Sequence, residues 1–184
     1  MAPTPPRITK HHGRGNDFVV VVDPDAAHPL DAEVARALCE RRTGVGADGC
    51  IRATPVPPGA GDGGRTRMEL RNADGSRAET SGNGLRCLAQ ALVLAGDRTL
   101  HRLPVLTDAG LRVATVHGRT GAATHDISVS MGAARIRGEA PEWTGGDVTR
   151  ALVVDMGNPH LVLDLSAARP SAAEELDLVA LGEL

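Results

Sequence analysis

The sequence predicts an α+β protein in which a β-rich roll surrounds one central buried helix, followed by a second, similar unit that is incomplete. Residues 83–95 have a helical pattern that is apolar nearly all round, so other structure must enclose them. Strand patterns with alternating apolar positions precede and follow this helix. An irregular stretch at 131–147 marks a domain boundary, so we expect one domain at 1–132 and a truncated one at 133–184.

Strand patterns separated by Gly-containing turns run along the first domain. A helix is expected at 31–42, where Asp31 can cap the first turn and apolar residues recur at helical spacing. The segment PVPPGAGDGG, at 55–64, is expected to be a surface loop. The expected strands are 7–12, 18–23, 50–54, 65–71, 76–80, 102–107, 111–117 and 125–130.

The second domain is predicted from VTRALVVDMGNPHLVLDL, at 148–165, which contains two strands joined by a turn at GNPH. A helix is expected at 171–184. Roughly fifty residues with these elements are too few for an independent hydrophobic core. We therefore expect this domain to lack its other half.

Composition excludes several classes of function. The formal net charge is −3 and there is one Phe, one Trp and no Tyr, which does not favour nucleic acid as a partner. No apolar run approaches the ~18 residues of a membrane span. Cys39, Cys50 and Cys87 are odd in number and lack metal-ligand spacing, so we expect free thiols in a reducing cytoplasm.

Four polar turns follow or precede apolar strands: GRGND, GVGADG, NADG with SGNG, and GNPH. Asn, Asp and Gly are ordinary turn residues, so each turn alone can be purely structural. Together they indicate a site for a small, polar, zwitterionic molecule. The turn SGNG gives the clearest physical argument for a binding site, because it begins the buried helix and its unpaired N–H groups attract a carboxylate.

The two candidate nucleophiles near this turn have different expected roles. Ser81 either faces the bound molecule or simply caps the helix, and the sequence leaves both interpretations open. Cys87 is about one turn further along and is expected to be a small buried hydrophobe. No phosphate-binding loop or dinucleotide fingerprint is present. Adjacent His11 and His12 point to opposite faces of a strand, so they cannot jointly bind one metal ion. A pyridoxal cofactor needs a Schiff-base lysine, for which Lys10 is the only candidate, so we expect cofactor-free chemistry.

Four blocks resemble the signatures of the diaminopimelate epimerase family, a group of cofactor-independent amino-acid racemases and epimerases. They are HHGRGNDFVVVVD, RRTGVGADGCI, RNADGSRAETSGNGLRC and VDMGNPHLV, in the family's order and at similar spacing. The resemblance implies two similar domains, each a β-rich roll around a helix. It also implies inversion of a Cα without a cofactor, by one cysteine thiolate that removes the proton and a second thiol that returns one.

The resemblance assigns roles to particular residues. Ser81 stands at the position of the family's first catalytic cysteine, and His160 would tune the acid/base pair. The α-carboxylate would lie at the N-terminus of the helix, at Gly82 and Asn83. The substrate contacts implied by the resemblance are Asn16, Asn72, Gly82, Asn83 and Asn158.

Two features depart from the family pattern. The first is the serine at position 81, because a serine hydroxyl is far less acidic than a thiol. It therefore needs a neighbouring base to act as a nucleophile or base, and His160 is the candidate. The block with the family's second cysteine does not occur before Leu184. The leading hypothesis is an isomerase that interconverts L,L- and meso-diaminopimelate, completed by a homodimer or a complementing C-terminal chain. A catalytically inactive paralogue that binds an amino-acid-like ligand, and an epimerase of another amino acid, are the alternatives.

Overall fold

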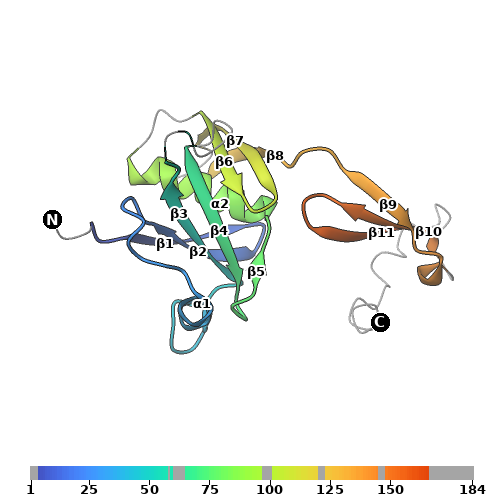
Figure 1. Ribbon diagram of the computed structural model, residues 1–184, viewed down its shortest axis with the longest axis horizontal. Coiled ribbons are helices and arrows are strands. Elements are labelled where there is room, and N and C mark those ends of the chain that lie inside the picture. The colour runs from blue at the N-terminus through green and yellow to red at the C-terminus, as the bar shows by residue number, and fades with distance from the viewer. Residues whose placement is uncertain are drawn as a thin grey trace. The chain divides into compact units, whose positions relative to one another are not determined.

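The computed structural model describes residues 4–57, 59, 65–96, 101–119, 123–144 and 148–165. Their contacts divide the chain into two compact units, Met1–Gly132 and Ala133–Leu184, shown in Figure 1. Each unit is described by itself below.

The first unit contains one mixed sheet of eight strands. Seven of them follow one another in the order β1-β2-β3-β4-β6-β7-β8, and β5 pairs with β4. The pairs β2–β3 and β4–β6 are parallel, and the others are antiparallel. The strands are β1 Arg7–Gly13, β2 Asn16–Val22, β3 Gly49–Pro55, β4 Thr66–Asn72, β5 Arg77–Ala78, β6 Arg102–Thr107, β7 Gly110–Arg119 and β8 His125–Ser130.

The sheet curls around helix α2 (Gly82–Ala95). This curling follows from the contacts, because α2 touches both β1 and β8, which are the opposite edges of the sheet. The helix is enclosed because apolar side chains lie on most of its circumference, and Leu85, Leu88 and Ala89 are fully buried. A β-rich half-barrel around one buried helix is thus confirmed.

The outer face of the sheet is covered in part by helix α1 (Ala32–Cys39). Asp31 caps this helix by accepting a hydrogen bond from the Val34 N–H at 2.8 Å, as its sequence position predicts. Ala35 and Cys39 pack against Cys50 and neighbouring apolar side chains of β2. Side chains on the two faces alternate along each strand, so the inner core around α2 and this outer cluster are separate.

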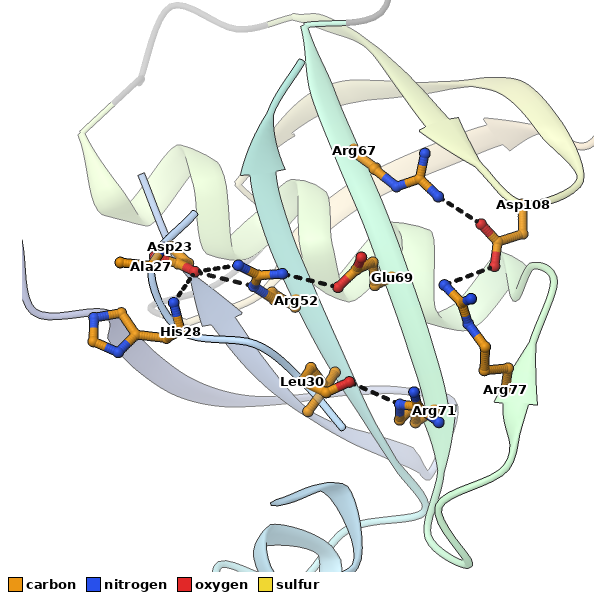
Figure 2. Close-up of polar contacts among 10 residues, drawn as sticks. All are labelled: Asp23, Ala27, His28, Leu30, Arg52, Arg67, Glu69, Arg71, Arg77 and Asp108. Atoms are coloured by element: carbon orange, nitrogen blue, oxygen red, sulfur yellow. Dashed lines mark hydrogen bonds and ion pairs between the residues drawn. The ribbon is translucent and has the colours of Figure 1, made fainter. Parts of the chain in front are cut away.

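Beyond α1, the outer face carries buried and half-buried ion pairs (Figure 2). Asp23 is fully buried and accepts hydrogen bonds from both Nε and Nη2 of Arg52, at 3.0 and 2.8 Å. Arg52 Nη1 also binds Glu69 at 3.1 Å. Burial opposes ionisation of Asp23, but the donors of His28, Arg52 and Ala27 outweigh it and lower the pKa of Asp23.

The second unit contains a three-stranded antiparallel sheet in the order β11-β10-β9. Its strands are β9 Arg135–Glu139, β10 Val148–Asp155 and β11 Pro159–Leu165, with a 3-10 helix at Pro141–Trp143. The prediction that 131–147 is wholly irregular was therefore wrong, because pairing with β10 makes a strand of Arg135–Glu139 despite its exposed, polar sequence. The helix predicted at 171–184 lies outside the described residues, as does part of the loop predicted at 55–64.

Among the described helices, none has both the length and the apolar character needed to cross a membrane.

Candidate active site

Ser81 occupies the N-cap position of α2. Its backbone is extended, with φ −147° and ψ 125°, and its Oγ accepts a hydrogen bond from the Gly84 N–H at 3.0 Å. The Ser81 carbonyl accepts the first helical bond, from the Leu85 N–H at 2.8 Å. The capping interpretation of Ser81 is thus confirmed, and one of the amides expected to bind ligand is already used by the protein.

The N–H groups of Gly82 and Asn83 are the two that stay available. Within the part of the chain that the structure describes, neither amide donates to a protein acceptor. Both residues are half-buried and lie in the first turn, where the partial positive charge of the helix is concentrated. The first turn contains no acidic side chain that would compete for this charge. These two amides are therefore able to bind a small carboxylate.

Gly84 lets the start of α2 approach the sheet closely. A Cβ at this position would lie 3.0 Å from Ile51 Cδ1 and 3.2 Å from Met68 Cε. A side chain here would force the ends of the Ile51 and Met68 side chains, or the first turn itself, to shift. The glycine therefore fixes how near the open amides sit to the end of the sheet.

Asn16 and Asn72 are brought to the same end of the sheet, on the face that α2 covers. Strand pairing aligns Phe18 with Gly49 and Gly49 with Asn72, and Asn16 begins β2 two residues before Phe18. Side chains alternate along strands, so Asn16 shares the inner face with Phe18, and Asn72 shares it with Leu70.

The N-terminus of α2 reaches this same end of the sheet. Asn16 pairs with Gly13 across the β1–β2 turn. A Cβ built on Gly13 would lie 3.2 Å from Asn83 Oδ1, so Asn83 rests against that turn. Asn83 Oδ1 also accepts a hydrogen bond from Arg86. The structure thus brings Asn16, Asn72 and the open amides toward one end of the first unit.

A network of two aspartates holds these segments in register, and the sequence reading did not identify it. The Asp17 N–H donates to Asp48 Oδ2 at 3.0 Å, and the Asp48 N–H donates to Asp17 Oδ1 at 2.9 Å. Arg41 Nη2 binds both carboxylates, at 2.9 and 2.7 Å. The hydrogen bonds from Arg41, aided by those from Lys10 and Asp48, hold the pKa of Asp17 well below its usual range.

This network joins two of the predicted substrate-binding turns. Asp17 directly follows Asn16, and the carbonyl of Asp48 accepts a hydrogen bond from the Ala73 N–H, beside Asn72, at 3.0 Å. Both aspartates belong to the polar turns GRGND and GVGADG, but the site predicted from the sequence contains Asn and Gly positions of the turns and neither aspartate. The signal available was the aspartate inside each motif, Asp17 after Asn16 and Asp48 before Gly49.

Cys87 lies in the hydrophobic core. It is 2% exposed, and burial raises the pKa of its thiol to about 11. A thiol with this pKa is almost entirely protonated at neutral pH and is a poor base. Cys87 therefore behaves as the buried hydrophobe that the sequence predicts.

Asn158 and His160 lie in the second unit, at the turn between β10 and β11. The carbonyl of Asn158 accepts hydrogen bonds from the Met156 N–H at 3.1 Å and from His160 Nδ1 at 3.0 Å. The His160 ring thus lies against the backbone of this turn. The proximity of Asn158 and His160 to Ser81 stays a prediction, since each unit is described by itself.

No group of three or more His, Cys, Asp or Glu side chains within the described ranges is arranged to hold a metal ion.

Comparisons with known proteins were made by sequence and by structure. A family profile described as diaminopimelate epimerase matches residues 8–137. A diaminopimelate epimerase from Rhodococcus jostii (strain RHA1) is 38% identical over 184 residues, covering 94% of this chain and 63% of that relative. One from Mycolicibacterium paratuberculosis (strain ATCC BAA-968 / K-10) is 42% identical over 172 residues, covering 84% of this chain and 58% of that relative. The chain thus spans less than two thirds of the length of these relatives.

Solved structures share the fold at low sequence identity. A hydroxyproline epimerase from Agrobacterium vitis, with bound trans-4-OH-L-proline, superposes with a TM-score of 0.62 at 14% identity, covering 97% of this chain and 59% of that one. A predicted epimerase from Pseudomonas aeruginosa gives a TM-score of 0.61 at 16% identity, covering 90% and 62%. These two likenesses concern the fold alone. The profile match, which spans most of the described first unit, shows that the chain belongs to the diaminopimelate epimerase family.

Proposed function

We propose that this chain supplies one half of an isomerase that interconverts L,L- and meso-diaminopimelate by cofactor-free proton transfer at Cα. The observation that carries the proposal is the pair of open amides at Gly82 and Asn83, at the same end of the sheet as Asn16 and Asn72. The relatives named diaminopimelate epimerase, at 38% and 42% identity, support the choice of substrate. Such a reaction serves lysine and peptidoglycan precursor biosynthesis.

The amides would bind the α-carboxylate of the substrate and stabilise the charge that develops on it when the α-proton leaves. Two N–H donors fixed by the helix need no reorganisation when this charge develops. The Asn16 and Asn72 side chains would bind the polar groups around Cα. Asn158 and His160 would contribute from the second unit, with His160 as a tuning group.

Ser81 would stand beside Cα at the position of the family's first acid/base residue. Its neutral hydroxyl can donate a proton to a carbanion, whereas abstraction requires that a base first remove the hydroxyl proton. The capping bond from Gly84 would stabilise an alkoxide at Oγ, because its N–H points at that oxygen. The second acid/base group would come from the part of the relatives' length that this chain does not span, whether that part follows in a longer protein or belongs to a complementing C-terminal chain or a homodimer partner.

A second candidate function is favoured by the capping bond itself. Capping of the helix by its hydroxyl is enough to explain why a serine stands at position 81, without any catalytic role. The same amides and asparagines would then bind an amino-acid-like ligand without turnover. A third candidate is an epimerase of another amino acid. It would use the same residues of this chain to bind the groups around Cα, and the substrate would differ at its distal end.

Exchange of the α-proton in deuterated water separates these functions. L,L-diaminopimelate is incubated with the full chain, alone and with a fragment carrying the unmatched part of the Rhodococcus jostii relative. Deuterium incorporation by mass spectrometry supports the epimerase, and saturable binding without incorporation supports the binding protein. If the chain shows no deuterium incorporation and no binding, with or without the fragment, both functions are contradicted.

Ser81→Cys tests whether position 81 faces the site. A thiol at a helix N-terminus has a lowered pKa, so we expect alkylation by iodoacetamide at least about tenfold faster than at an ordinary exposed thiol. Ser130→Cys, at an exposed position of β8, is the matched control. The native cysteines give a low background because all three are buried. A thiol at position 81 as inert as Cys87 would show that it faces the core.

We propose that the protein works in the cytoplasm. Its three cysteines are free and buried, as is usual where thiols stay reduced.

A further inference from the structure

The outer face of the sheet carries two arginines directly opposite each other at its β4–β5 margin. Strand pairing aligns Arg71 of β4 with Arg77 of β5. Both point away from α2, because the neighbouring Leu70 and Ala78 pack in the inner core. Like charges at directly opposite positions repel, with Cβ atoms about 5 Å apart. This pair therefore needs negative charge nearby.

The protein supplies little of that charge to Arg71. Its Nε donates to the Leu30 carbonyl and its Nη1 to the Gly75 carbonyl, both at 2.8 Å. Within the described ranges, no carboxylate lies within 4.0 Å of its guanidinium and its Nη2 has no acceptor. Carbonyl oxygens satisfy two N–H groups but do not neutralise a half-buried cation. Among the described residues Arg71 thus has no ion-pair partner, and the two acids that line a hollow with it, Asp31 and Glu69, are each hydrogen-bonded elsewhere.

In the segments that the structure describes, the ion-pair partner of Arg77 is one that it shares with a second arginine. Asp108 binds Arg67 at 3.0 Å and Arg77 at 3.5 Å, so one carboxylate serves two guanidinium groups (Figure 2). Glu69, two residues before Arg71 on β4, is engaged by Arg52 at 3.1 Å. Asp31 is engaged as the cap of α1. The arginine pair is therefore short of negative charge.

A hollow lies beside the pair. Its volume is about 320 Å³, and its charged lining residues are the three arginines Arg52, Arg71 and Arg77 and the two acids Asp31 and Glu69. This is at the small end of ligand sites and is ample for one phosphate or carboxylate group. Guanidinium groups match such anions well, since two parallel N–H donors can bind two oxygens.

We propose that this hollow binds a small oxyanion, a phosphate or carboxylate group, between Arg71 and Arg77. The anion accepts from the open Nη2 of Arg71 and from the free donors of Arg77, and it removes the repulsion across the β4–β5 ladder. The site lies on the face of the sheet opposite α2, so it is independent of the proposed epimerase site.

Titration with inorganic phosphate and, separately, with acetate tests the site in the full chain at pH 7. Chloride keeps the ionic strength constant, and the readout is the NMR shift of the arginine Nε–H groups and of the Leu30 and Asp31 amides. At least one of the two anions is expected to give a saturable shift confined to these groups. Tighter binding of phosphate would indicate a phosphorylated ligand, and tighter binding of acetate would indicate a carboxylate ligand.

Arg71→Gln and Arg77→Gln are each expected to raise the apparent Kd about tenfold or more, as loss of a charge-assisted bond implies. Arg102→Gln, at an exposed position of β6, is the matched control and should leave the Kd unchanged. If Arg71→Gln fails to fold because it loses the Leu30 and Gly75 contacts, Arg77→Gln alone decides. Shifts that do not saturate with either anion, or that are equal in Arg77→Gln and Arg102→Gln, would overturn the proposal.

Discussion

Asp17, near the start of β2, and Asp48, directly before β3, exchange backbone-to-carboxylate hydrogen bonds at 3.0 and 2.9 Å, although they are 31 residues apart in the sequence. Arg41 bridges the two carboxylates and offsets their mutual repulsion. Because Asn16 precedes Asp17 and the Asp48 carbonyl holds the turn after Asn72, this pairing positions both asparagines. The site therefore depends on charged residues that need not touch the ligand.

Replacing Arg41 with Gln should loosen this arrangement. The two carboxylates would face each other without their shared cation, so we expect a lower urea midpoint and altered amide shifts at Asn16 and Asn72. Arg42→Gln is the matched control, because Arg42 is exposed and its side chain makes no hydrogen bond or ion pair with the described residues. Equal effects of the two substitutions would contradict the positioning role of Arg41.

The stability of the first unit should depend on the charge of Asp17 in acid. Its pKa is lowered in the folded state, so the unfolded chain binds the proton more readily, and stability falls as pH drops below about 4. Asp17→Asn should flatten this dependence between pH 5 and about 2 in urea unfolding. Asp126→Asn, at an exposed position of β8, should leave the slope as in the wild type. An unchanged slope in Asp17→Asn would rule out this source of acid sensitivity.

Ser81→Ala removes the N-cap of α2. Loss of the bond from Gly84 should lower the free energy of unfolding by about 1 kcal/mol. Ser130→Ala, at an exposed position of β8, should change it by less than about 0.5 kcal/mol. Chemical denaturation of the two variants measures the difference in unfolding free energy. A Ser81→Ala variant as stable as the wild type would show that the N-cap does not stabilise the protein.

Cys87→Ala should affect packing and nothing else. Truncating a fully buried side chain should cost about 1 kcal/mol in unfolding free energy and leave ligand affinity unchanged. Cys87→Ser keeps the size but buries a hydroxyl in the core, so it should cost more. A loss of ligand affinity in Cys87→Ala at full folding would mean that the thiol faces the site.

The sequence predicts the architecture well because its signals are local and strong. A helix apolar nearly all round must be enclosed, and Gly82–Ala95 is enclosed by the curled sheet. The strand Arg135–Glu139 escaped prediction because its residues are exposed and its only support is pairing with β10, a contact distant in sequence. Its β-structure comes from the ladder and not from its own pattern.

The candidate site was predicted less completely. The position of Ser81 at the start of α2 is visible in the pattern SGNG, but whether its hydroxyl caps the helix is a matter of geometry. The Asp17–Asp48 exchange joins two turns, and each turn alone has an ordinary explanation in turn chemistry. The cross-strand partnership of Arg71 and Arg77 likewise depends on register.

The central claim is that the Gly82 and Asn83 amides bind a substrate carboxylate. An NMR titration of the isotope-labelled chain with L,L-diaminopimelate observes these amides directly. We expect saturable downfield shifts at both residues, with smaller shifts at Asn16 and Asn72 and none in the β11 strand interior. Unchanged Gly82 and Asn83 amides at saturating ligand, in a chain whose spectrum shows it to be folded, would contradict the claim.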